Sequence, residues 1–343
     1  MLRRLNIPSI FETLGGFLLA IALLAMLFAS FSRPASGKSS PQTLALLPGS
    51  AEFVVSLDTF ALRKSDLVAE MEKRFDSVPE AAENYRRFVR ETGVDPRQDT
   101  DQVLMVLRHA EGAGDSGFLI IAQGRFGSNR LVDLAQEKGG STVALADGTR
   151  VWSSRSSSNR EAAEASQKIV ALAQPDQGTV LFGQESEVLR ALDVLAGRKP
   201  PEPKGPKLRE LLSGVDRRAP AWAVLNSSVL AGRLSSEIAQ KDPSWNPGDA
   251  VSRVESVTFM GWAGKDVTVK ARVTAKDLET AGLLADVARG ALAAGKLAAK
   301  DQDQELLRIL QETKLTQDGT IVEIEARIPA SRFQLKPIEA AER

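Results

Sequence analysis

The residues with the clearest chemical potential lie together between Arg108 and Phe118, in the sequence RHAEGAGDSGF. This stretch holds His109, the only histidine of the chain, and Ser116, which stands in a GDSG pattern typical of serine-protease nucleophiles. A serine nucleophile needs a base that a third group orients, and a loop of small and acidic residues would fix neither side chain. We therefore expect no catalytic pair here and interpret the stretch as a hairpin turn.

Two glycine patterns resemble nucleotide-binding loops. Gly112, Gly114 and Gly117 spell G-x-G-x-x-G, but the following residues, FLIIAQGRF, predict a strand, whereas a dinucleotide site needs a helix N-terminus there. The second pattern, GALAAGKL at residues 290–297, has leucine where a phosphate-binding loop has serine or threonine, and it lies in a helical region. Neither pattern predicts a cofactor, and we expect the second one to be a helix whose small residues pack closely against a sheet.

Acidic residues near the C-terminus suggest a metal site only at first sight. Four of them follow the spacing of a calcium-binding loop: Asp301, Asp303, Glu305 and Glu312. Leu306 stands where that loop requires glycine, so we expect a helix start instead. Glu323 and Glu325 alternate with apolar residues and should lie on the exposed face of a strand. We predict no metal ligands.

Composition excludes several classes of function. The chain has 343 residues, no cysteine and one histidine, which rules out disulfides, thiolate metal sites and any site with two imidazoles. Lys and Arg together number 44 and so do Asp and Glu, giving a formal net charge of zero. A chain without basic excess and with only 5% aromatic residues does not indicate nucleic-acid binding.

Trp245 is the one candidate contact residue. It lies in KDPSWNPGD, between Pro243 and Pro247, and an aromatic side chain in a rigid loop can bind a partner. Packing within the protein is the competing interpretation. Trp222 and Trp262 lie in strand patterns and are expected in the core.

The N-terminus is expected to direct the chain to a membrane. Arg3 and Arg4 precede the uncharged segment from Thr13 to Ser32, whose twenty residues could span a bilayer core as a helix. A cleaved signal peptide, ending near Ala35-Ser36-Gly37, is the alternative. We favour an uncleaved single-pass anchor in the cytoplasmic membrane. In both cases the rest of the chain lies on the extracytoplasmic side.

Strand and helix patterns predict an α+β protein of two similar halves. Each half reads strand, helix, two strands, helix, strand, which resembles the split β-α-β unit of ferredoxin-like folds, with an antiparallel sheet covered by helices. Helices are expected at 161–174 and over 277–313. The predicted division is 1–36 signal anchor or signal peptide, 37–50 tether, 51–197 first module, 198–208 linker, 209–336 second module and 337–343 tail.

Several phrases are similar to those of bacterial envelope proteins of the DUF3352 kind. LALLPGSAEFVVSLDTFALRKSDLV resembles their opening, and TGVDPRQDTDQVLMVL and IIAQGRF resemble later phrases, so that the likeness spans most of Leu44 to Phe333. The resemblance implies a signal or anchor followed by an extracytoplasmic α+β module, and it brings no catalytic residues.

The sequence thus favours a membrane-tethered extracytoplasmic protein that binds or scaffolds other envelope proteins without catalysis. The alternative is an extracytoplasmic hydrolase that uses carboxylates. Two facing acids of separated pKa in a cleft would favour the enzyme, whereas an extended apolar surface would favour the binding protein.

Overall fold

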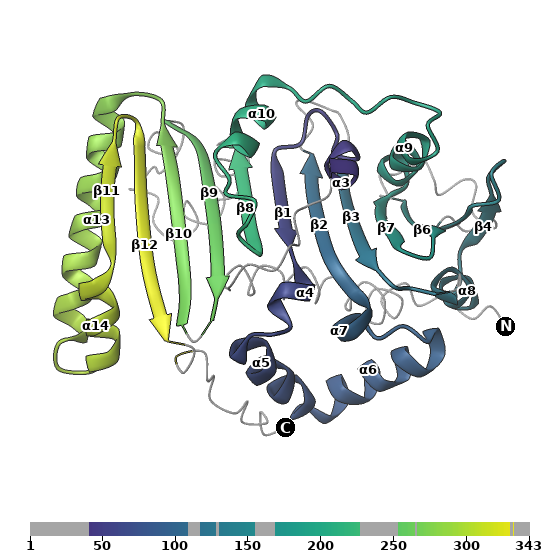
Figure 1. The fold of residues 1–343 in the computed structure, drawn as a ribbon, viewed down its shortest axis with the longest axis horizontal. Helices are drawn as coiled ribbons and strands as arrows, with labels where there is room; N and C mark the ends of the chain where they lie inside the picture. Colours follow the sequence, from purple (N-terminus) through teal and green to yellow (C-terminus); the bar gives the residue numbers. More distant parts are fainter. Residues whose placement is uncertain are drawn as a thin grey trace, which may run out of the picture.

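The protein forms one antiparallel sheet with helices on both faces (Figure 1). The computed structural model describes residues 41–108, 117–127, 130–154, 169–226, 253–264, 266–329 and 332. Within these residues the sheet has twelve strands in the order β11-β12-β10-β9-β8-β1-β2-β3-β7-β6-β5-β4, and every neighbouring pair is antiparallel. The expected α+β class is confirmed.

The elements up to residue 195 form the part of the sheet from β1 to β4. The strands are β1 Phe53–Leu57, β2 Thr100–Arg108, β3 Gly117–Gly124, β4 Ser141–Ala144, β5 Arg150–Ser153, β6 Val170–Asp176 and β7 Thr179–Gln184. The helices are α3 Pro41–Ala45, α4 Thr59–Leu62, α5 Asp66–Asp76, α6 Pro79–Thr92, α7 Pro96–Asp99, α8 Arg130–Glu137 and α9 Glu185–Leu195.

The elements after residue 205 form the part from β8 to β11. They are α10 Pro206–Ser213, β8 Ala221–Asn226, β9 Val254–Ala263, β10 Asp266–Ala275, α13 Leu278–Ala299, α14 Gln304–Glu312, β11 Lys314–Asp318 and β12 Ile321–Pro329. The two parts join where β1 pairs with β8, with Phe53 opposite Leu225. One core therefore contains residues of both parts, such as Leu192 and Leu208.

Strand alternation divides the apolar residues between the two faces of the sheet. In β1, Val54 lies in the core that α3, α9 and α10 cover, whereas Val55 lies in the core that α5 covers. Helix α13 lies on the same face as α5, because Val322, which packs near Ala281, and Ile328 are six residues apart on β12. Helix α8 shares that face, since Phe118 packs against both its core and that of α5.

The structure corrects three predicted elements. Residues 170–174 were expected in a helix, but they form β6, which pairs with β5 and β7 on both sides. The strand expected at residues 320–329 is confirmed as β12, but β11, which pairs with it through a turn at Gly319, was not predicted. The segment predicted as a linker overlaps α10 at 206–208, and Glu202 accepts a hydrogen bond from the Gly49 amide at 2.8 Å.

The ferredoxin-like order is correct only in part. A split unit has two parallel strands, joined by a helix, with an antiparallel strand between them. Strands β10 and β11 meet this description, with β12 between them. Strands β3 and β6 are likewise parallel with β7 between them, but their connection contains β4 and β5 as well as α8. The pairs β1–β2 and β8–β9 do not, because each pair is adjacent and antiparallel.

Among the described residues, no helix combines the length and the apolar character that a membrane span requires. The segment predicted to span the membrane, Thr13 to Ser32, lies outside the described residues.

Candidate functional site

The stretch from Arg108 to Phe118 connects β2 and β3, which pair as an antiparallel hairpin. Arg108 at the end of β2 lies opposite Gly117 at the start of β3. His109 and Ser116 themselves lie outside the described residues. Because a strand and not a helix follows Gly117, the glycine pattern has no helix end that could bind a phosphate.

The other sequence candidates occupy structural positions or lie outside the described residues. Trp245 is among the latter. Trp222 is buried and Trp262 packs against the same core, as expected. Asp303 caps α14 by accepting a hydrogen bond from the Leu306 amide at 2.9 Å, which confirms the predicted helix start.

The glycine-rich segment that resembled a phosphate-binding loop lies inside α13, so the helical interpretation is confirmed. Its expected packing is corrected, because a Cβ at Gly295 would lie 3.1 Å from Leu310 of α14 and not against the sheet.

Glu323 and Glu325 lie on the sheet face opposite α13, half-buried in ion pairs. Lys270 Nζ lies 2.9 Å from Glu323 and 3.3 Å from Glu325, and Arg272 lies 2.9 Å from Glu323. The described residues include no cluster of acidic or histidine side chains suited to a metal ion.

Glu187, at the start of α9, is one of two deeply buried carboxylates in the described part of the chain, the other being Asp58. The Glu187 side chain is 5% exposed and lies 2.8 Å from the Arg108 guanidinium and 2.9 Å from that of Arg190. Arg190 also donates a hydrogen bond to the Leu46 carbonyl at 2.7 Å. The carboxylate and its two arginines therefore link the end of β2 to α9 and to the segment just after α3. Removing the carboxylate would leave both arginines without their shared partner, so we interpret Glu187 as a structural residue.

A second group of polar side chains joins α5, α6 and α7. The Arg97 guanidinium lies 4.2 Å from the Tyr85 ring centre and 5.0 Å from that of Phe75, and it donates to both carboxylate oxygens of Asp76 at 2.8 and 3.2 Å. These hydrogen bonds hold the pKa of Asp76 below its usual range. Burial raises the pKa of the neighbouring Glu72.

We expect Arg97→Gln to return the pKa of Asp76 toward the ordinary aspartate value of 3.8. A pKa lowered by folding means that the ion pair stabilises the protein above about pH 4 and that this contribution is lost as the pH falls through the folded-state pKa. An NMR titration of the Asp76 carboxyl carbon measures the change. Arg86→Gln is the control, because Arg86 has only a weaker charge effect on Asp76. Equal shifts in both variants would contradict the assignment.

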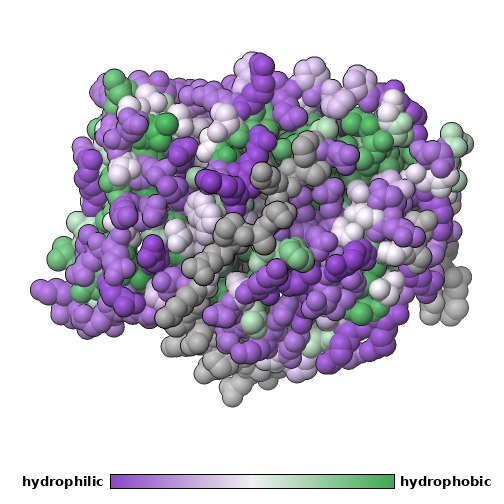
Figure 2. Space-filling model, viewed as in Figure 1, coloured by the Kyte–Doolittle hydropathy of each residue, from purple (hydrophilic) through white to green (hydrophobic). Residues whose placement is uncertain are grey.

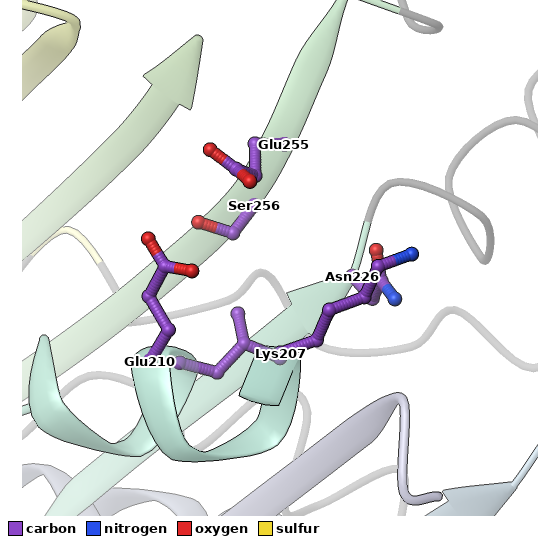
Figure 3. Close-up of a pocket in the computed structure, with 6 residues that line it drawn as sticks. Lys207, Glu210, Asn226, Glu255 and Ser256 are labelled. Atoms are coloured by element: carbon purple, nitrogen blue, oxygen red, sulfur yellow. The ribbon is translucent and has the colours of Figure 1, made fainter. Parts of the chain in front are cut away.

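A small hollow lies between α10 and the ends of β8 and β9. Figure 3 shows Glu210 of α10 pointing toward Ser256 of β9, while Lys207 extends toward Asn226. Its volume of about 20 Å³ accommodates one water molecule, far less than the several hundred cubic ångströms of a metabolite site. Most of the residues that line the hollow are polar, but it is too small for a substrate.

The most apolar exposed helix is α13. Leu283, Val287 and Leu297 are 56%, 70% and 74% exposed, and they lie on the side of the helix away from the buried Ala281 and Ala285. Helix α13 lies along the outer edge of the sheet beside β11 (Figure 1). The surface seen from the same direction is mostly hydrophilic, with hydrophobic areas at this left edge and over α9 at the upper right (Figure 2). An exposed apolar surface of this kind marks a binding site more often than a catalytic one.

The comparisons with known proteins define no family. No family model and no curated protein match the chain. The chain is similar to solved structures of TP0453. Crystal form IV has a TM-score of 0.46 at 10% identity and covers 85% of this chain and 94% of its own. Crystal form III has 0.46 at 11%, covering 85% and 95%, and crystal form I has 0.44 at 11%, covering 87% and 96%.

Proposed function

We propose that the protein is a membrane-tethered, extracytoplasmic binding or scaffolding protein without catalytic activity, related to the envelope proteins of the DUF3352 kind. The observation that carries the binding role is the outward apolar surface of α13, with three large side chains more than half exposed. The tether rests on the uncharged segment from Thr13 to Ser32. The partners are the membrane, through that segment, and other envelope proteins, and not nucleic acid.

The ionic groups of the described residues also favour a binding role. Both carboxylate oxygens of Glu187 accept hydrogen bonds from arginines, one from Arg108 and one from Arg190, at 2.8 and 2.9 Å. Both carboxylate oxygens of Asp76 accept hydrogen bonds from a single arginine, at 2.8 and 3.2 Å. A carboxylate whose oxygens accept hydrogen bonds from arginine is engaged within the protein, whereas a general acid or base must exchange a proton with substrate.

The alternative remains an extracytoplasmic hydrolase, and one observation favours it. Glu72 and Asp76, one helical turn apart on α5, have pKa values shifted in opposite directions, as in a pair that divides acid and base roles. Against this alternative, the hollow with room for a water molecule lies beside α10 and is lined by other residues.

We also propose that the two halves contain a duplicated unit. The order β1-β2-β3-β7-β6 is matched by β8-β9-β10-β12-β11. Helices α8 and α13 follow the third strand in each series and lie on the same face of the sheet.

We expect the full-length protein to remain in the membrane fraction with its body outside the cytoplasm. Because the chain has no cysteine, Val143→Cys places a single thiol on β4 at a position that is 59% exposed. A membrane-impermeant maleimide should label this variant in spheroplasts without lysis. The cysteine-free wild type is the control for background labelling.

Two results would overturn this placement. Labelling of Val143→Cys only after lysis would put the body in the cytoplasm. An intact mass that corresponds to a chain beginning near Lys38 would show that the N-terminal segment is cleaved. The segment would then be a signal peptide and not an anchor.

A further inference from the structure

The outward side of α13 carries a regular apolar seam. Leu283, Val287, Gly290, Ala294 and Leu297 are separated by four and three residues in alternation, which is the spacing of the core positions of a coiled coil. All five are exposed. Because the opposite side of the helix packs on the sheet, the seam faces away from the body of the protein.

Gly290 in the middle of this seam is not explained by the fold of one chain. A Cβ at this position would meet no atom within 4 Å. Glycine inside a helix lowers stability by about 1 kcal/mol relative to alanine. Among the described residues, no neighbouring atom lies so close to Gly290 that a larger side chain would be excluded. A glycine in a coiled-coil seam allows a side chain from another helix to approach the backbone closely.

The charges of α13 indicate the direction of that second helix. Acidic residues occupy its start, with Asp277 as the N-cap followed by Glu279 and Asp286, and Lys296 and Lys300 occupy its end. Two such helices side by side in the same direction place like charges together. The antiparallel direction places acidic starts beside basic ends, and the two helix dipoles then also oppose each other.

We propose that two copies of this chain associate through α13, packed antiparallel around a two-fold axis between residues 288 and 289. This register places Leu283 against the partner's Ala294 and Val287 against the partner's Gly290, so that a large side chain meets a small one. Glu279 then lies beside the partner's Lys300 on the rim of the seam. A self-complementary surface of this kind is what a two-fold dimer requires.

The charge balance favours a second copy over a lipid surface. Within α13 the charged residues are Glu279, Asp286, Arg289 and Lys296, two acidic and two basic. Helices that lie on membranes are instead rich in basic residues on their polar side. The alternating four-and-three spacing is also the pattern of helix pairing.

This inference specifies the partner of the α13 surface and therefore rests on the proposed function, but the two can fail separately. Labelling of Val143→Cys reports where the body lies, whereas cross-linking through α13 reports what covers the helix.

Cysteine cross-linking in isolated membranes tests the register. Full-length Leu283→Cys and Ala294→Cys chains with tags of different size are produced together and treated with a mild oxidant. We expect a disulfide between the two tagged chains and little product when either variant is present alone, since in this register each position lies far from its own copy. Products from each variant alone would show a parallel pair and would overturn the proposal, as would the absence of any product.

Charge reversal tests the partner independently. Glu279→Lys or Lys300→Glu alone should weaken association by about tenfold, because the two-fold axis turns two attractive rim pairs into repulsive ones. The double variant Glu279→Lys/Lys300→Glu should restore association. Val287→Glu should abolish it, whereas Leu195→Glu on α9, at a position that is 40% exposed, is the matched control.

Failure of the double variant to restore association would overturn the antiparallel pairing. So would quenching of a fluorophore on Leu283→Cys by nitroxide-labelled lipids while cross-linking is absent, since a membrane surface would then be the partner of α13.

Discussion

Replacing Glu187 by alanine is expected to lower the free energy of unfolding by about 3–5 kcal/mol, the largest effect of any single charged residue in the described part of the chain. The reason is the position of the carboxylate between Arg108 and Arg190, which lose their shared partner in a site where Glu187 is 5% exposed. Urea denaturation of the variant measures the change.

Glu137→Ala is the matched control. Glu137 forms an exposed ion pair with Arg130 at 3.4 Å, and its loss should change stability by at most about 1 kcal/mol. Glu187→Gln, which keeps the shape and removes the charge, should lie between the two. A loss below about 1 kcal/mol for Glu187→Ala would show that water and not the two arginines satisfies this carboxylate.

The second large effect is expected from Gly183→Ala in β7. An added Cβ would lie 2.3 Å from the Phe118 carbonyl oxygen and 2.9 Å from the Leu119 Cα of the neighbouring strand. Because β3 is held between β2 and β7, its backbone cannot move away without disturbing two pairings. We expect a loss of about 3 kcal/mol or more, from overpacking against rigid backbone.

A glycine-to-alanine substitution in a helix serves as the control for the stability loss expected from Gly183→Ala. Gly282 of α13 has no atom within 4 Å of an added Cβ, so Gly282→Ala should raise stability by up to about 1 kcal/mol. Calorimetric midpoints of both variants distinguish the two cases. A neutral Gly183→Ala would mean that β3 and β7 separate more easily than their register indicates.

Local patterns predicted the parts of the fold that neighbouring residues determine. The hairpin that ends at Arg108 and Gly117 follows from two apolar strands with a turn between them. The alanines of segment 161–174 favour a helix in the sequence. In the structure, however, Val170 and Leu172 pack under α8, and their strand β6 pairs with β5 on one edge and β7 on the other. Pairing with neighbouring strands therefore outweighs the local helix preference of residues 170–174.

The ion pairs between distant segments could not be predicted from one sequence. Glu187 and Arg108 are 79 residues apart, and only the position of α9 over β3 and β7 brings them together. The seam of α13 is different, because its alternating spacing of four and three residues is visible in the sequence.

The pairing of β1 with β8 bears on how the chain reaches this fold. Every other pairing of the described sheet joins strands that belong to the same part of the chain. Strand β1 instead pairs with β8, so that Phe53 lies opposite Leu225, a residue far along the sequence. During synthesis β2 can pair with β1 long before β8 has been made, so β1 keeps one open edge for that interval. Contacts between such distant segments form slowly, and an open strand edge can pair with another molecule. Closure of this central seam is thus the step at which folding and aggregation compete, and a folding factor would be most useful there.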